Sequence, residues 1–278
     1  QESFLSDVLH AGTSDFSWTG YPIYLQYVDS KYKVETQSVS AYGHVEWQFG
    51  DQWSLVTGLR YTSEQREISD ACTYDVNGDI NLILGTPAGA NQCGTFNMDA
   101  MDFVPYSDEL KTNNWSGKVG LDFKANEDTL IYAFVANGFK SGGYQGAHAS
   151  LSTQWGPYEE ETLMAYELGI KTALPEQRMR INASAFMYKY DDKQVSDFFF
   201  DETFQDLSTI INLDKSEING LEAEWIWNPV EGLDIRLAGT WLDAKVKDGM
   251  AYDLVTKGQT SVAGHTLSNS PKFQGSAL

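Results

Sequence analysis

Glycine, lysine and serine gather in one short segment, Gly138-Phe-Lys-Ser-Gly-Gly143, which invites comparison with phosphate-binding loops. In such a loop the lysine follows the last glycine, and a helix begins directly after it. Here Lys140 precedes Gly142, and the residues before the segment alternate as in a strand. The segment is therefore better interpreted as the end of a strand, where glycines permit a sharp bend, than as a phosphate site.

Residues that could bind metal or perform catalysis form no complete set. Asp75, Asn77 and Asp79 alternate like calcium ligands, but the glycine and glutamate expected at positions six and twelve of a calcium loop are absent. The pattern favours an acidic turn and leaves calcium binding as the alternative. The histidines are scattered along the chain: His10, His44, His148 and His265. Without a GxSxG, HExxH or Cys/His cluster, we expect no enzyme activity, no resident metal and no cofactor.

The chain has two cysteines, Cys72 and Cys93, in a stretch rich in Gly, Asn and Asp. We expect them to form a disulfide that closes a long loop in an oxidising compartment. The alternatives are two unrelated thiols or half of a metal site, and no CxxC or nearby histidine supports the latter. In the chain-entropy model, closing a loop of this size contributes about 3 kcal/mol.

The charge balance excludes some partners. The 278 residues include 39 acidic and 19 basic side chains, a formal net charge of −20. Nucleic-acid binding depends on Lys and Arg that displace counterions, so we expect no nucleic-acid partner. The 8 Trp, 15 Tyr and 14 Phe predict that most of the chain is ordered, because disordered chains are poor in aromatics. The length suits one large domain or two ordinary ones.

Alternation of apolar and polar residues dominates the sequence from about residue 38. In 38–49, for example, Val39, Val45 and Trp47 alternate with polar neighbours. A period of two over ten or more residues predicts a strand with one apolar and one polar face. The pattern recurs in further segments: 53–61, 115–124, 129–139, 164–174, 179–187, 221–227 and 233–241. Counting from Tyr21, we expect nine or ten strands, the last beginning near Pro271.

Short and long connections alternate along the chain. The short ones are 50–52, 125–128, 175–177 and 229–232. The long ones are polar, at about 69–112, 141–157, 200–208 and 248–269. This order predicts antiparallel hairpins with the tight turns at one end and the loops at the other, as in outer-membrane barrels with short periplasmic turns and long extracellular loops.

The two faces of the expected strands support a transmembrane antiparallel β-barrel. Aromatics lie near the strand ends of the apolar face, as an interfacial girdle requires, and the opposite face carries both signs of charge. The apolar runs are too short for a membrane-spanning helix. A soluble two-sheet protein is the alternative. Because unpaired strand edges are not tolerated in lipid, we expect residues 1–278 to be part of a larger barrel.

Six segments, in order, resemble strands of TonB-dependent outer-membrane receptors. They are Leu55–Tyr61 (LVTGLRY), Leu130–Tyr144 (LIYAFVANGFKSGGY), Tyr166–Lys171 (YELGIK), Arg180–Tyr190 (RINASAFMYKY) with Gln194-Val195, Asn219–Glu224 (NGLEAE) and Asn269–Lys272 (NSPK). The resemblance covers roughly residues 36–278, the middle and later parts of that family's barrel, and it implies a complete barrel of 22 strands. The TonB box, the plug domain and the closing strands are absent from this sequence.

The resemblance implies a receptor in the bacterial outer membrane, surrounded by lipid and lipopolysaccharide. Such a receptor captures a scarce, bulky nutrient, such as a siderophore–iron complex, cobalamin or an oligosaccharide. It imports the nutrient with energy from the TonB complex, which acts through the absent N-terminal region. Phe139, Lys140, Tyr144 and Trp155, at the mouth of the barrel, are the expected ligand contacts. The alternative function is a passive, porin-like pore.

Overall fold

The computed structural model describes residues 28–75, 95–97, 102–145, 154–201 and 205–278 of the chain. These residues form strands and one 3-10 turn, Pro175–Gln177. The predicted antiparallel all-β class is therefore confirmed. In the part of the chain that the structure describes, no helix is long and apolar enough to cross a membrane.

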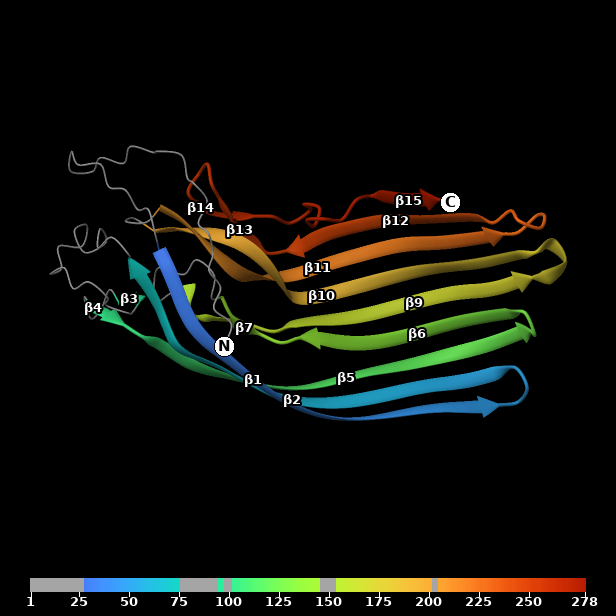
Figure 1. Cartoon of the computed structure of the whole chain (residues 1–278), viewed down its shortest axis with the longest axis horizontal. Helices are drawn as coiled ribbons and strands as arrows, with labels where there is room; N and C mark the ends of the chain where they lie inside the picture. The colour runs from blue at the N-terminus through green and yellow to red at the C-terminus, as the bar shows by residue number, and fades with distance from the viewer. Residues whose placement is uncertain (1–27, 76–94, 98–101, 146–153, 202–204) are drawn as a thin grey trace. The chain divides into compact units, whose positions relative to one another are not determined.

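Nine strands form one sheet, in which neighbours in the sheet follow one another along the chain (Figure 1). In sheet order they are β1 (Val28–Phe49), β2 (Trp53–Asp75), β5 (Tyr106–Asn126), β6 (Thr129–Lys140), β9 (Glu161–Leu174), β10 (Met179–Asp201), β11 (Gln205–Trp227), β12 (Ile235–Asp248) and β15 (Phe273–Ala277). The ladders described between β5 and β15 are all antiparallel. Three small hairpins complete the fold: β3 (Thr95–Asn97) with β4 (Asp102–Val104), β7 (Gly143–Tyr144) with β8 (Pro157–Tyr158), and β13 (Met250–Asp253) with β14 (Gly258–Ser261).

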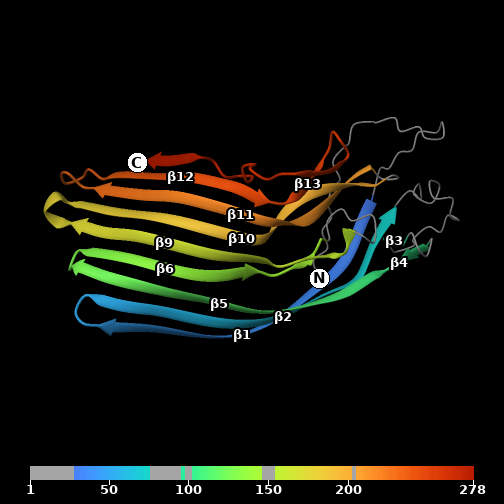
Figure 2. The ribbon, with the colours of Figure 1, turned by 180° about the vertical axis from the view of Figure 1, so that it is seen from behind.

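The four tight connections lie together at one end of the sheet, which we call the short-turn end (Figures 1 and 2). Backbone hydrogen bonds join neighbouring hairpins there. The Lys124 amide donates to the Gln52 carbonyl at 2.7 Å, and the Asn228 amide donates to the Arg178 carbonyl at 3.0 Å. Arg178 adopts φ 54° after the 3-10 turn, which allows the chain to reverse within a few residues.

The strands extend beyond the expected segments at their other ends. β2 continues to Asp75 and β5 starts at Tyr106, both inside the polar stretch expected to be a loop. Antiparallel ladders need only backbone donors and acceptors, so polar hairpins can extend past the alternating segments. Residues 21–27, where the expected strands begin, lie outside the described residues, and the first described strand is β1.

The chain divides into two compact units. Unit 1 comprises residues 1–37, 64–111 and 142–158, and unit 2 comprises 38–63, 112–141 and 159–278. Strands β6, β9–β12 and β15 belong entirely to unit 2, whereas β7 and β8 belong to unit 1.

Unit 2 leaves large apolar side chains uncovered along one side of its sheet, the apolar face. Trp115, Val119, Leu168 and Leu221 are all more than half exposed. They follow the predicted alternation. Soluble monomers rarely expose such continuous apolar surface, so this face requires a nonaqueous environment.

The exposure of the apolar face also bears on the alternative of a soluble two-sheet protein. A two-sheet protein would cover Leu237 and its ladder partner Trp225 with a second layer. Leu237 is instead 40% exposed and Trp225 only half-buried, beside Trp227 at 5.5 Å between ring centroids. No second sheet covers this face in the described ranges.

Unit 2 has its own small core, away from the short-turn end. Leu213, Ala244, Val246 and Leu267 are each less than a tenth exposed. The β11–β12 ladder has a register shift between Lys215 and Ser216, whose partners are Asp248 and Val246. Lys247 is therefore the extra residue, and it lies on β12. Because side chains alternate with a period of two, such a shift changes how the faces of the two strands match beyond it.

Candidate functional site

Phe139 and Lys140 form the last two positions of β6, in unit 2. Their ladder partners on β9 are Thr162 and Glu161. Phe139 is half-buried and Lys140 is exposed. Both residues lie where the regular ladder stops and the chain leaves the sheet, as the sequence predicts for the end of this strand.

The surroundings of Gly143 explain why the chain has a glycine at this position after Lys140. It is buried in unit 1 and pairs with Tyr158 in the β7–β8 ladder. A Cβ at this position would lie 2.6 Å from Nη1 of Arg66 and 2.7 Å from the hydroxyl of Tyr158. Glycine is thus required because two side chains pack directly on the backbone. The Arg66 guanidinium therefore packs directly on the backbone of this segment.

Tyr144 and Trp155 meet in one aromatic cluster of unit 1. Trp155 is fully buried beside Ile68 and Ala71, and Tyr32, Tyr106 and Tyr144 pack around these three residues. The Tyr32 and Trp155 rings meet edge to face, 5.5 Å between centroids. Trp155 is therefore central to the packing of unit 1, and the indole Nε1 has no hydrogen-bond partner among the described residues.

Two tyrosines of this cluster, Tyr106 and Tyr144, have raised pKa values. Burial and the nearby Asp108 carboxylate raise the pKa of Tyr106 to about 12, and its hydroxyl donates to Asp108 Oδ2 at 3.1 Å. The pKa of Tyr144 is also raised, by burial first and then by Asp108. Burial disfavours a phenolate, and a neighbouring carboxylate disfavours it further.

Arg66 gives unit 1 a positive group beside these aromatics. Its Nη2 lies 3.0 Å from Oε1 of Glu64, and both side chains are largely buried. The sequence reading missed Arg66, Tyr106 and Tyr158, because they lie in or beside stretches interpreted as loops. The Gly-Gly pair at 142–143 was the available signal, since paired glycines often mark a close approach of side chains to backbone.

Of the four expected contact residues, the structure brings Tyr144 and Trp155 together in unit 1, and it places Phe139 and Lys140 in succession on β6 of unit 2. Their roles as ligand contacts stay predictions. The disulfide also stays a prediction, because Cys93 lies outside the described residues. The acidic segment 75–79 lies outside them beyond Asp75. No group of three or more metal-binding side chains occurs in the described ranges.

The second side of the unit 2 sheet, the polar face, carries ordered aromatic and charged side chains. The Tyr132 hydroxyl donates to Oε1 of Glu167 at 2.7 Å. The Tyr132 ring lies over Gly169 and the Phe186 ring over Gly220, each on the neighbouring strand. The Lys118 ammonium lies 3.7 Å from the Phe134 ring centroid. Such a surface suits a passage that contains water and protein groups.

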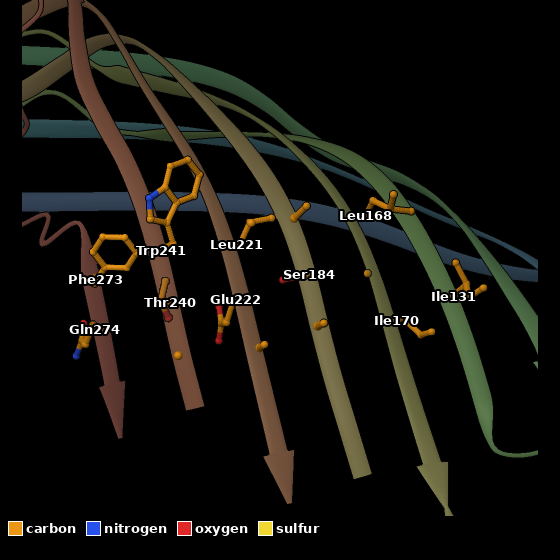
Figure 3. A pocket seen from close by; sticks show the side chains of 15 residues that line it. Ile131, Leu168, Ile170, Ser184, Leu221, Glu222, Thr240, Trp241, Phe273 and Gln274 are labelled. Carbon is orange, nitrogen blue, oxygen red and sulfur yellow. The ribbon is translucent and has the colours of Figure 1, made fainter. Parts of the chain in front are cut away.

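A hollow of about 740 Å³ lies on the apolar face (Figure 3). Small residues on adjacent strands, Ala183, Ala223 and Gly239, are ladder neighbours at its floor. Leu221 and Trp241 border it. The hollow thus results from small side chains between larger ones on the apolar face, and it contains none of the expected ligand contacts.

A family comparison explains this architecture. The family model described as "TonB dependent receptor-like, beta-barrel" matches residues 4–278. The chain belongs to this family. The resemblance inferred from the six segments is thereby confirmed, as is the predicted membrane β-barrel class. The described sheet is an open part of such a barrel, with β1 and β15 at its edges.

Solved structures with this fold include three bacterial receptors. The ferric yersiniabactin uptake receptor FyuA of Yersinia pestis is 17% identical, with a TM-score of 0.62 over 90% of this chain and 32% of that one. The siderophore receptor PiuA of Acinetobacter baumannii is 18% identical, with a TM-score of 0.60 over 88% and 31%. The ferric-catecholate import receptor Fiu of E. coli K12 is 17% identical, with a TM-score of 0.55 over 87% and 31%. The chain spans about a third of the length of these three receptors.

Proposed function

We propose that this chain is part of a bacterial outer-membrane receptor that captures a scarce, bulky nutrient and imports it with energy from the TonB complex. The observation that carries the proposal is the two-faced sheet of unit 2. Leu168 and Leu221 are more than half exposed on one face, whereas Tyr132 and Glu167 are hydrogen-bonded on the other. An apolar face toward lipid and a polar face toward the lumen are what a transport barrel requires.

A ferric siderophore is the proposed ligand class. Support comes from the solved structures of similar fold, which are described as receptors for ferric yersiniabactin, siderophores and ferric catecholates. The aromatic side chains and Arg66 of unit 1 suit ligands that combine aromatic rings with negative charge. Cobalamin and oligosaccharides are the ligand classes that the experiment must distinguish.

We assign ligand contact to Phe139, Lys140 and Tyr144, and a supporting role to Trp155. Lys140 is exposed and Phe139 and Tyr144 are partly exposed, whereas Trp155 has no exposed surface. A fully buried side chain affects a ligand through the packing of its neighbours. The surrounding lipid and lipopolysaccharide contact the apolar face in this proposal.

The test uses the complete receptor that contains these residues, expressed in a Gram-negative strain lacking other siderophore receptors. Radioactive iron uptake is measured with ferric catecholate and ferric hydroxamate complexes, and labelled cobalamin and maltooligosaccharides are tested in parallel. We expect uptake of at least one ferric siderophore, and its loss in a strain without TonB. Uptake of cobalamin or oligosaccharide alone would contradict the ligand class.

The same assay separates the receptor from a passive pore. A pore passes solutes down their gradients, so an uncoupler that removes the proton-motive force would leave its uptake unchanged. An energised receptor stops transporting while it still binds ligand at the cell surface. Uptake that continues without TonB and with the uncoupler would refute the proposed coupling.

A further inference from the structure

Backbone groups lose their ladder partners where β6, β9 and β10 separate. The β6–β9 ladder ends at the pair Lys140–Glu161, and the β9–β10 ladder ends at the pair Thr162–Asp191. β10 continues to Asp201, although β9 no longer pairs with it. Ser141 is partly buried at this point and Glu159 is exposed, so their backbone groups take side chains or water as partners.

Side chains of unit 2 supply these partners. Gln194 Nε2 donates to the Ser141 carbonyl at 3.0 Å and to the Glu159 carbonyl at 2.9 Å. The backbone N–H of Gln194 donates to Oε2 of Glu161 at 2.9 Å, and Glu161 is only 8% exposed. One glutamine therefore satisfies backbone groups on both sides of the departing segment.

Asn212, on β11, repeats the arrangement from the next strand. Its Oδ1 accepts from the Glu159 amide at 3.0 Å, and its Nδ2 donates to the Glu159 carbonyl at 3.0 Å. The same Nδ2 donates to the carbonyl of Asp192 at 2.8 Å, where the backbone adopts φ 55°. Glu159 is thus held through both of its backbone groups.

These contacts coincide with the boundary between the units. The chain leaves unit 2 after Ser141 and re-enters it at Glu159. The residues between them include Gly143, Tyr144 and Trp155. Gln194 and Asn212 therefore join the exit and the return of the segment 142–158, beyond the point where the backbone ladder ends.

We propose that Gln194 and Asn212 are positioning residues that hold both ends of the segment 142–158 and so keep Tyr144 and Trp155 ordered for ligand capture. The ligand-capture part of this inference rests on the proposed function, whereas the ordering of the segment does not. The β7–β8 ladder would still pair the two ends of the segment, but removing the two side-chain donors would let the ends move more, and the entropic cost of ordering the segment would rise.

The first experiment measures hydrogen exchange of the complete receptor in detergent. Gln194→Ala removes the donors, and Gln194→Glu has the same shape but places a carboxylate against two carbonyl oxygens. We expect amides of the β7–β8 ladder to exchange about tenfold faster in Gln194→Ala, because the hydrogen bonds to the Ser141 and Glu159 carbonyls are lost. Gln194→Glu should have the larger effect, and Asn212→Leu should resemble Gln194→Ala.

Asn182→Ala is the matched control on the same strand. Asn182 Nδ2 donates to Oε2 of Glu224 at 2.8 Å, an exposed side-chain bond between β10 and β11 near the short-turn end. We expect this variant to leave exchange in 142–158 unchanged. Unchanged exchange in all Gln194 variants would overturn the proposal. Equal acceleration throughout the β9–β10 ladder would also overturn it, because the side chain would then merely stabilise the sheet.

The second experiment measures binding of a ferric tris-catecholate complex to the same variants. We expect about tenfold weaker binding for Gln194→Ala and unchanged binding for Asn182→Ala. Faster exchange in 142–158 together with wild-type affinity would refute the role in capture. If the unmodified receptor does not bind the probe but binds cobalamin or an oligosaccharide, the proposed ligand class fails, and the affinity comparison is made with that ligand.

Discussion

Units 1 and 2 use the same kinds of side chain in opposite ways. In unit 1, Trp155 and Ile68 have no exposed surface. In unit 2, Trp115 is 60% exposed and Leu168 58% exposed. Unit 1 thus packs apolar side chains against one another, as proteins in water do, whereas the sheet of unit 2 directs them outward. The difference shows that the two units are built for different surroundings.

The comparison also shows where sequence alternation is informative. In the sheet of unit 2, successive residues of a strand lie alternately on the apolar and the polar face, so the period of two is visible in the sequence. In unit 1 a few distant residues gather around Trp155, and no period marks them. Predictions that treat the two units separately can test this account.

The largest effect is expected for Trp155→Ala. Removing a large, fully buried aromatic side chain typically costs about 3–5 kcal/mol. We expect the amides of residues 66–71 to lose most of their protection from hydrogen exchange. Trp115→Ala, at an exposed position of unit 2, should leave them unchanged. Equal protection in both variants would mean that Trp155 is not central to unit 1.

Leu168→Arg should destabilise the sheet of unit 2 in lipid by about 2–4 kcal/mol, the range for arginine near the bilayer midplane. Urea titration of the complete receptor in lipid vesicles measures this change. Thr240→Arg, on the polar face, is the control and should cost much less. If both variants cost the same, the two faces do not meet different environments.

A smaller effect is expected inside the polar face. In Gly169→Ala the added methyl group would overlap the Tyr132 ring, and overpacking of this kind costs about 1–3 kcal/mol. Gly138→Ala is the control, because no atom lies within 4 Å of a Cβ there. The same vesicle titration compares the two variants. If Gly169→Ala leaves the free energy of unfolding unchanged, the Tyr132 ring can move away from the added methyl group without cost.

The smallest effect concerns pH. Because the pKa of Tyr106 is raised to about 12 by burial and by Asp108, the folded state favours the neutral phenol. Its stabilising contribution is complete below the unfolded pKa of about 10 and is lost as the pH rises through about 12. Ultraviolet titration against Tyr106→Phe should show one phenol ionising late. Ionisation near pH 10 would contradict the burial of this hydroxyl.

The fold of unit 2 could be predicted because it depends on local patterns. Segments such as 164–174 alternate strictly, and turns such as Pro175–Gln177 contain residues that end strands. The β11–β12 register could not be predicted past Lys215, because nothing in the sequence marks Lys247 as an extra residue on β12.

The candidate site was only partly predictable for a related reason. Lys140 and Tyr144 lie within a recognisable motif, so the end of the strand before them could be predicted. Arg66 and Gln194 act through residues distant in sequence, and only the folded structure shows that Arg66 packs on Gly143 and that Gln194 bonds to Glu159. Long-range contacts of this kind leave no local pattern.

The account depends most directly on β9, which should present its residues alternately to lipid and to an aqueous lumen. Single spin labels at positions 164 to 168, 170 and 171, in a complete receptor whose native cysteines are replaced by serine, can be probed in outer-membrane vesicles. We predict that oxygen, which concentrates in lipid, relaxes labels at Met164, Tyr166, Leu168 and Ile170. A water-soluble nickel complex should instead relax those at Ala165, Glu167 and Lys171. Equal access of the nickel complex to both sets would contradict the membrane barrel.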